Sequence, residues 1–300
     1  MASAARQGTP ETGRGKITAV WTALRPLEWI KNAFVLAPLL FSGRFDEMGA
    51  VVDTAIAFVC FCAAASAGYL LNDIRDADLD RAHPVKRMRP IAAGALDVGT
   101  AAVVAAVLGI AALGGALAVA PELAAAVAAY IALTAAYTVV LKRMVILDSM
   151  AIAGCFLLRV LGGTVSADVT ASEWLIVCTA MLALFLSFTK RRQEAVSEMH
   201  SGRDSRPVLE HYSLPFLDQI VSLVTAGTVI SYAIYATESP IVGDEMLFTA
   251  PMVLYGIFRY LYLVYDREDP RSAPTLLRSD PGMIGAVAAW VATVLVLLYL

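Results

Sequence analysis

Long runs of apolar residues, separated by short polar segments, extend through almost the whole chain. Runs such as AAVVAAVLGIAALGGALAVA are continuous and rich in Ala and Leu, without the alternation of a membrane β-strand. About 20 apolar residues of α-helix cross a bilayer core that is about 30 Å thick. The pattern therefore predicts nine transmembrane helices, at residues 26–42, 50–72, 98–119, 122–141, 146–165, 172–190, 214–237, 246–265 and 281–300.

The composition supports a membrane protein and excludes a soluble one. Hydrophobic residues make up 59% of the chain and charged residues 16%, against about 45–50% and about 25% in soluble domains. Mean hydropathy is +0.69. Residues 1–16 are polar and lack the apolar stretch of a signal peptide, so we expect a cytoplasmic tail followed by one catalytic transmembrane domain over residues 17–300. The predicted fold class is all-α, a polytopic membrane protein.

Charge and cysteine content exclude two further classes. The 23 Lys and Arg residues nearly balance the 26 Asp and Glu residues, for a net charge of −3, so the basic excess of a nucleic-acid binder is missing. Four Cys residues, two of them inside one apolar run, form neither a disulfide framework nor a zinc-binding pattern. We therefore expect no nucleic-acid partner.

The basic residues of the loops follow the positive-inside pattern. With the N-terminus in the cytoplasm, the predicted outer loops hold a single basic residue, Arg44. These outer loops are residues 43–49, 120–121, 166–171 and 238–245. We therefore expect a protein of a bacterial-type cytoplasmic membrane with its N-terminus inside. The long inner loops 73–97 and 191–213 carry both signs of charge, so the active site is expected to face the cytoplasm.

Acidic residues recur in the segment NDIRDADLDRAHPVKRMRPIAAG, directly after the second predicted span. If the helix continues at about 100° per residue, Asp73, Asp76 and Asp80 lie on one stripe with Asn72 beside them. Clustered anions repel one another unless a cation lies between them, and Mg²⁺ prefers carboxylate and phosphate oxygens. The stripe therefore predicts a Mg²⁺–diphosphate site. The alternative is a solvated helix end whose acids pair with cations of the same segment.

Three cations follow the acids. Lys86, Arg87 and Arg89 suit a substrate with several phosphates, because guanidinium groups bind phosphate through paired hydrogen bonds. The alternative is the ordinary positive charge of an inner loop. Further polar side chains are expected at the same side of the membrane. They are Trp29, Lys31, Asn32, Tyr137, Lys142, Arg143, Asp148, Lys190, Arg191 and Glu194.

Several of these side chains also have simpler explanations. Lys31 and Lys142 are placed where a lysine extends to the membrane interface. Glu194 lies one helical turn from Lys190, so an ordinary ion pair on an exposed helix end is the alternative to a functional role.

Arg159 lies about halfway along the fifth predicted span. A charge at that depth costs at least about 2.5–3.5 kcal/mol unless it faces protein, water or a ligand, so a functional cavity is the preferred interpretation and a structural pairing the alternative. His83, His200 and His211 lie in predicted loops without metal-ligand spacing, and we expect them to face solvent.

The spacing Asn72-Asp73-x-x-Asp76-x-x-x-Asp80 resembles the first Asp-rich motif of the UbiA superfamily of intramembrane prenyltransferases. RPLEWIKN, the whole acidic segment, the pair Tyr137…Lys142, LLRVLGG and KRRQE resemble the decaprenyl-phosphate phosphoribosyltransferase branch of that superfamily. The resemblance implies nine helices around a central cavity that opens to the cytoplasm.

The branch implies a Mg²⁺-dependent transfer of phosphoribose from phosphoribosyl diphosphate to a polyprenyl phosphate in the bilayer, with release of diphosphate. Most aromatic prenyltransferases of the superfamily carry a second Asp-rich motif after the sixth span, where this chain has KRRQE, with one acid and three cations. Extra cations suit a donor with an additional 5-phosphate. Close relatives also suggest a homo-oligomer.

The resemblance and the residue types together assign expected roles. Asp73 and Asp76 are expected to ligate the metal, assisted by Asp80 and Asn72. The expected ligands of the donor phosphates are Lys86, Arg87, Lys190 and Arg191. Those expected at the acceptor phosphate or the diphosphate are Lys31, Lys142 and Arg159, and Asn32 and Arg89 are also expected to bind substrate. Tyr137 is expected to orient a phosphate or a ribose hydroxyl, and Glu194 to hold ribose hydroxyls or a cation.

Two other functions compete with this interpretation. An enzyme of the same fold could attach an isoprenyl chain to an aromatic or quinone-precursor acceptor. A lipid or ion transporter is more remote, because the charges gather at one side of the membrane and the sequence has no convincing internal repeat.

Overall fold

The computed structural model describes residues 13–170, 172–201, 208–238, 243–267, 271 and 273–299. Residues 1–12 of the predicted tail lie outside this part. The described elements are α1 Gly13–Leu24, η1 Pro26–Val35, α2 Ala37–Phe41, α3 Met48–Arg75, α4 Ala77–Ala82, η2 Lys86–Met88, α5 Val98–Val119, α6 Pro121–Val139, η3 Leu141–Arg143, α7 Leu147–Ser166, α8 Glu173–Ser201, η4 Leu209–His211, α9 Leu214–Thr237, η5 Gly243–Thr249, α10 Ala250–Tyr265, α11 Ala273–Ser279 and α12 Pro281–Tyr299.

All of these elements are helical and the described residues contain no strand, which confirms the all-α prediction. Within the described ranges, eight segments are long and apolar enough to cross a membrane: α3, α5, α6, α7, α8, α9, η5 with α10, and α12. Large apolar side chains such as Val103, Ile110 and Leu223 are more than half exposed, as expected where a helix faces lipid. The chain is therefore an integral membrane protein.

The first predicted span, 26–42, is not a continuous helix. It forms the 3₁₀ helix η1 and the short helix α2, which begin near Pro26 and Pro38. Proline is tolerated in the first turn of a helix but not in its interior, so Pro38 favours a new start over continuation. A Cβ atom at Gly163 of α7 would lie only 2.1 Å from the Val35 carbonyl oxygen, which shows how closely the η1 backbone packs on α7.

The predicted span at 246–265 agrees with the apolar segment Gly243–Tyr265, which begins as the 3₁₀ helix η5 and continues as α10. The predicted end of the sixth span, at residue 190, was wrong. Helix α8 continues to Ser201, so much of the predicted loop 191–213 is helical and His200 lies on a helix, although the side chain of His200 is outside the described part. Charged residues in the last turns of α8 hide this continuation from an apolar pattern.

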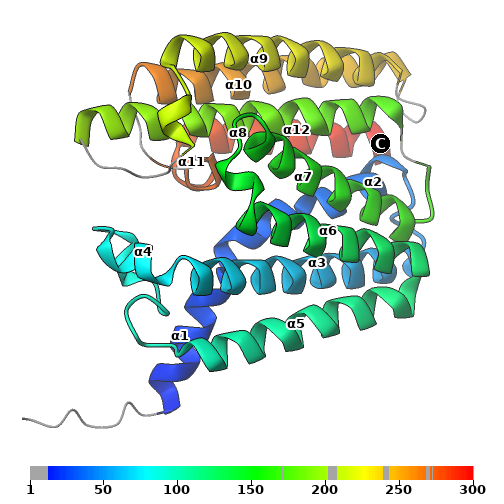
Figure 1. Ribbon diagram of the computed structural model, residues 1–300. Coiled ribbons are helices and arrows are strands. Elements are labelled where there is room, and N and C mark those ends of the chain that lie inside the picture. Colours follow the sequence, from blue (N-terminus) through cyan, green and yellow to red (C-terminus); the bar gives the residue numbers. More distant parts are fainter. Residues whose placement is uncertain are drawn as a thin grey trace, which may run out of the picture.

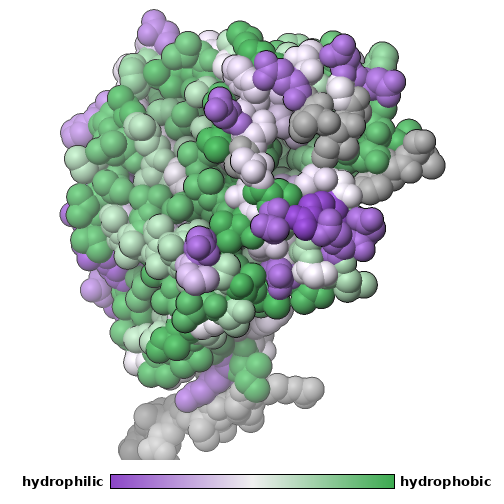
Figure 2. Space-filling model, turned by 90° about the vertical axis from the view of Figure 1, so that its right-hand side faces the viewer, coloured by the Kyte–Doolittle hydropathy of each residue, from purple (hydrophilic) through white to green (hydrophobic). Residues whose placement is uncertain are grey.

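The long helices lie side by side, with α5 at one flank and α9 and α10 at the other, and α4 projects from one end of the bundle (Figure 1). One apolar core joins α8, α9 and α10 through residues such as Phe185, Leu217 and Tyr260. A second joins α3 to α6 through Phe61 and Leu123. Viewed from the opposite end, much of the surface is hydrophobic and hydrophilic groups form a few patches (Figure 2).

Candidate active site

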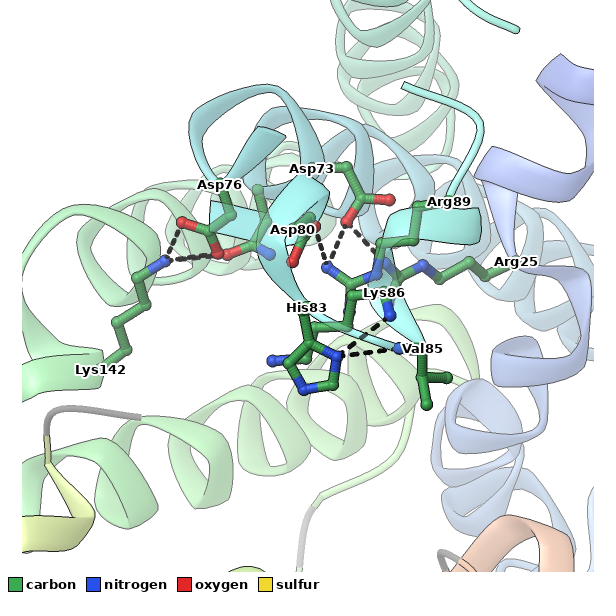
Figure 3. A network of polar contacts seen from close by, with 10 residues as sticks. Arg25, Asp73, Asp76, Asp80, His83, Val85, Lys86, Arg89 and Lys142 are labelled. Carbon is green, nitrogen blue, oxygen red and sulfur yellow. Dashed lines mark hydrogen bonds and ion pairs between the residues drawn. The ribbon is translucent and has the colours of Figure 1, made fainter. Parts of the chain in front are cut away.

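The acidic motif lies where α3 ends. Asp73 is in the last turn of α3, Asp76 lies between α3 and α4, and Asp80 is in α4. The predicted stripe assumed an unbroken helix, but the backbone turns at Asp76, with φ −93° and ψ 6°. Asp73 and Asp80 therefore share one side of the segment, whereas Asp76 points toward another element (Figure 3).

Asp73 and Asp80 meet on one guanidinium group. Arg89 Nη1 lies 3.1 Å from Asp73 Oδ1 and 2.7 Å from Asp80 Oδ2. Asp73 also accepts from Arg25 Nη2 at 2.6 Å. Arg25 separates α1 from η1 in a left-handed conformation, with φ 53°. Both acids are at least 95% buried, so the two arginines neutralise them where water has little access.

Asp76 has a separate partner. Lys142 Nζ lies 2.7 and 2.8 Å from its two carboxylate oxygens and 3.4 Å from Asn72 Oδ1 (Figure 3). Lys142 comes from η3, after α6, so this ion pair joins two elements that are distant in sequence. Its ammonium group is directed to the Asp76 carboxylate.

The donor set permits a magnesium ion, although not in the predicted form. Within the described ranges, no three or more His, Cys, Asp or Glu side chains converge on one point, so the three-carboxylate cluster is absent there. Two smaller sets, Asp73 with Asp80 and Asn72 with Asp76, each surround a side-chain cation. Mg²⁺ commonly takes one or two carboxylates and completes its shell with water and phosphate oxygens. Each pair therefore fits that mode of binding.

The basic turn Lys86–Arg89 follows α4 and returns toward the acids. Lys86 is half-buried and Arg87 is exposed. His83, which was expected to face solvent, accepts main-chain N–H groups of Val85 and Lys86 at Nδ1, each at 3.2 Å. His83 is half-buried, so its ring faces solvent only in part. Arg81 pairs with the exposed Asp78 and not with the buried acids.

The helix η1 adds a carboxylate that the sequence interpretation missed. Lys31 Nζ lies 2.5 Å from Glu28, one turn earlier, and both side chains remain about one-third exposed. Trp29 Nε1 donates to Ser66 of α3 at 3.0 Å and holds η1 against that helix. The i, i+3 spacing of Glu28 and Lys31 was a usable signal for this pair.

Arg159 and Asn32 bind each other inside the bundle. Arg159 Nε donates to Asn32 Oδ1 at 2.6 Å, Nη1 to the Cys155 carbonyl at 2.9 Å and Nη2 to the Tyr130 hydroxyl at 2.8 Å. Asn32 Nδ2 in turn contacts Cys62 Sγ at 3.1 Å. Three hydrogen bonds to neutral groups thus occupy guanidinium donors of Arg159, as expected of the structural pairing considered as the alternative.

Arg191 is also committed within the protein. It is 1% exposed, and its Nε lies 2.6 Å from Asp148 Oδ2 at the start of α7. Arg191 also contacts the Tyr137 hydroxyl at 3.3 Å and forms an ion pair with Glu194. Glu194 therefore has a buried partner in Arg191, and the side chain of Lys190, one turn away, is exposed.

Tyr212 completes this buried network. Its hydroxyl donates to Asp148 Oδ1 at 2.8 Å and accepts the Ile146 N–H at 2.6 Å. Burial, together with its bond to Asp148, raises the pKa of Tyr212 to about 12, so the hydroxyl keeps its proton at neutral pH. Ile146 has φ 70°, which is strained for a β-branched residue and which this bond helps to hold.

Two hollows on the surface of the described part of the molecule lie away from the acidic motif. One of about 470 Å³ separates α10 from α12 and includes Tyr255 and Gly285. Another, of about 280 Å³, lies between α1 and the start of α5 and includes Trp21 and Thr100. Neither contains a residue of the acidic motif, so the ion pairs mark the candidate site.

Known proteins identify the family of this helical arrangement. The UbiA prenyltransferase family matches residues 34–283. A Mycobacterium tuberculosis protein named decaprenyl-phosphate phosphoribosyltransferase is 36% identical over 283 residues, which cover 93% of each chain. A Corynebacterium glutamicum protein of the same name is 34% identical over 93% of this chain and 86% of its own length.

A solved structure shares the fold. The UbiA homologue from Archaeoglobus fulgidus bound to DMAPP and Mg²⁺ has a TM-score of 0.71 to this chain at 16% identity, covering 93% of this chain and 99% of that one. The family match extends over most of the chain, and the helical arrangement agrees with it. The chain is therefore a membrane-embedded transferase that belongs to the UbiA prenyltransferase family.

Proposed function

We propose that this enzyme transfers the 5-phosphoribosyl group from phosphoribosyl diphosphate to a polyprenyl phosphate and releases diphosphate, with Mg²⁺. The observation that carries the proposal is the alternation of acids and cations where α3 ends, with Asp73 and Asp80 on Arg89 and Asp76 on Lys142. Such a set can hold a metal and several phosphate groups together. Relatives about 35% identical that bear the corresponding name support this choice of donor.

Each of the two sets, Asp73 with Asp80 and Asn72 with Asp76, would hold a magnesium ion. When bound, Mg²⁺ would supply charge stabilisation to the departing diphosphate. Arg25, Arg89 and Lys142 now pair with these acids, and the same cations would pair with phosphate oxygens of the bound donor.

The transfer reaction does not require a strong general base. A phosphate oxygen of the acceptor forms a bond to the anomeric carbon of the ribose, and the bond from that carbon to diphosphate breaks. The acceptor phosphate is already anionic at pH 7, so no proton has to be removed from it. Lys and Arg side chains would hold both substrates in line and stabilise the negative charge that develops on the leaving group.

The remaining candidates divide into direct ligands and supports. Lys86, Arg87 and Lys190 are at least partly exposed and are proposed to contact the donor phosphates. Lys31 is proposed to contact the acceptor phosphate, with Glu28 directing its ammonium group. A second group acts through hydrogen bonds within the protein and supports the site. It comprises Asn32, Tyr137, Arg159, Arg191 and Glu194.

We also propose that the site faces the cytoplasm. The distribution of Lys and Arg among the loops supports this orientation, with the N-terminus inside.

Donor labelling separates the proposal from its nearest competitor. Purified enzyme in liposomes is incubated with Mg²⁺, decaprenyl phosphate and phosphoribosyl diphosphate labelled in the ribose, and the organic phase is counted. We expect ribose label in the lipid, and loss of that label when EDTA removes the metal. Transfer of a labelled isoprenyl chain to an aromatic acid, without ribose transfer, would overturn the proposal in favour of aromatic prenylation.

A further inference from the structure

Three consecutive main-chain N–H groups point to one residue at the start of the basic turn. The amides of Val85 and Lys86 donate to His83 Nδ1, each at 3.2 Å (Figure 3). The amide of Arg87 donates to the His83 carbonyl at 3.1 Å. His83 therefore accepts every main-chain donor from Val85 to Arg87. A nitrogen that accepts two amides carries no proton, so the ring proton of His83 lies on Nε2.

This arrangement is a cap made by an unusual residue. His83 ends α4 in an extended conformation, with φ −86° and ψ 132°, and Pro84 has no N–H to donate. The short helix η2 begins at Lys86 without a side-chain bond from Val85. Asp, Asn or Ser usually accept the first amides of a helix, and Nδ1 of His83 takes that role here.

The same residue connects the basic turn to the acids. The His83 amide donates to the Asp80 carbonyl at 3.1 Å, so one end of the link is fixed to α4. At the other end, the Arg89 amide donates to the Lys86 carbonyl at 2.9 Å. The Arg89 side chain then returns to Asp73 and Asp80, as described above.

We propose that His83 is a positioning residue that holds the turn Lys86–Arg89 against Asp73 and Asp80, so that its cations meet the diphosphate of the donor. The inference rests on one part of the proposed function, namely that the leaving group is a diphosphate. Both candidate donors, phosphoribosyl diphosphate and an isoprenyl diphosphate, contain that group. Inorganic diphosphate is therefore a probe of His83 that does not depend on which donor the enzyme uses.

The geometry of the ring suggests a rescue. Nδ1 of histidine and Oδ1 of asparagine are separated from Cβ by the same number of bonds, and asparagine commonly accepts amides two and three residues later. His83→Asn should therefore retain the cap. His83→Gln places its acceptor one bond further out, and His83→Ala has none. His211, exposed in η4, provides a matched control through His211→Ala.

Two measurements test the proposal in the full-length enzyme. Hydrogen exchange of the peptide that covers residues 84–90 should become about tenfold faster in His83→Ala and His83→Gln, because local opening exposes its amides. The Kd of the enzyme for inorganic diphosphate, measured with Mg²⁺ present, should rise about tenfold in the same two variants, because the cations of the turn lose contacts to the diphosphate. Both values should return to within about twofold of the unmodified enzyme in His83→Asn and remain unchanged in His211→Ala.

Each failure has a distinct meaning. Unchanged exchange in His83→Ala would overturn the cap, and faster exchange with an unchanged Kd would overturn the positioning role. A loss in His83→Asn equal to that in His83→Ala would also overturn it, because the acceptor would then not matter. If diphosphate binding behaves as expected but ribose label never enters lipid, the proposed function fails while the role of His83 remains.

Discussion

The ammonium group of Lys142 lies between the two carboxylate oxygens of Asp76, at 2.7 and 2.8 Å, although the residues are 66 positions apart. Asp73 and Asp80 have equally close cations in Arg25 and Arg89. From the sequence alone, ion pairing of the acids was the alternative to a magnesium site. These partners, however, come from beyond the acidic helix as well as from its loop, and the same cations are suited to bind phosphate.

Replacing an acid of the motif should abolish turnover without unfolding the enzyme. We expect Asp73→Asn and Asp76→Asn each to lower kcat at least about 100-fold, the scale associated with removal of one group that stabilises charge in the transition state. Radiolabel transfer and a melting curve measure the two quantities. Asp78→Asn is the control, because the Asp78 side chain is 93% exposed and pairs with Arg81. Turnover within tenfold of normal in either variant would contradict the metal assignment.

Replacing Lys142 should strengthen Mg²⁺ binding but slow the reaction. Lys142→Gln removes a cation that competes for Asp76, so the Mg²⁺ concentration for half-maximal activity should fall. The same change removes a positive charge near the phosphates, and kcat should fall about tenfold or more. Arg143→Gln, an exposed neighbour in η3, should change neither value. A higher magnesium requirement in Lys142→Gln would show that the lysine does not compete with the metal.

The contact between α7 and η1 should tolerate no added methyl group. Gly163→Ala places Cβ 2.1 Å from the Val35 carbonyl oxygen, so the free energy of unfolding should drop by about 1–3 kcal/mol or more. Gly285→Ala in α12 meets nothing within 4 Å and should be neutral or slightly stabilising. Thermal unfolding in one detergent compares the two variants. Equal melting temperatures would show that η1 can move away from α7.

The buried pair of Asp148 and Arg191 should be a major determinant of stability. Asp148→Asn leaves the Arg191 charge without its main buried partner, which typically costs about 3–5 kcal/mol. Tyr212→Phe removes only the bond between the hydroxyl and Asp148 together with that to the Ile146 amide, and should cost about 1–2 kcal/mol. Denaturant unfolding of both variants measures the two losses in the free energy of unfolding. A smaller loss in Asp148→Asn than in Tyr212→Phe would contradict the importance of the ion pair.

Arg159 should affect stability more than substrate affinity. Arg159→Met removes the bonds to Asn32 and Tyr130, so the melting temperature should fall while the KM of either substrate changes less than about threefold. Asn32→Ala should reproduce part of the same loss. A KM that rises tenfold for the lipid acceptor in a folded Arg159→Met enzyme would restore the original interpretation of Arg159 as a phosphate ligand.

The sequence predicted the membrane fold because long apolar runs leave a helix as the simplest way to satisfy the backbone in lipid. It could not reveal that residues 26–42 divide into η1 and α2, since hydropathy does not distinguish a 3₁₀ helix from an α-helix, although Pro26 and Pro38 were signals. Boundaries at charged helix ends, such as Ser201, were missed for a related reason.

The acids and most of the cations at the site could be chosen from their spacing. Their partners could not, because Arg25 meets Asp73 across 48 positions and Arg191 meets Asp148 across 43. Such pairs depend on how helices pack, which periodicity along one helix does not contain. His83 was missed because its function lies in a main-chain turn and not in a ligand pattern.

Two helices that carry the site exceed the thickness of the hydrocarbon layer. With 28 and 29 residues, α3 and α8 reach roughly 42 and 43 Å, and the layer measures roughly 30 Å. Their charged C-terminal turns thus extend to the depth of lipid headgroups. The phosphate of a lipid substrate can therefore reach the charged residues of the site without entering the hydrocarbon layer, while its isoprenoid tail stays among the lipid tails.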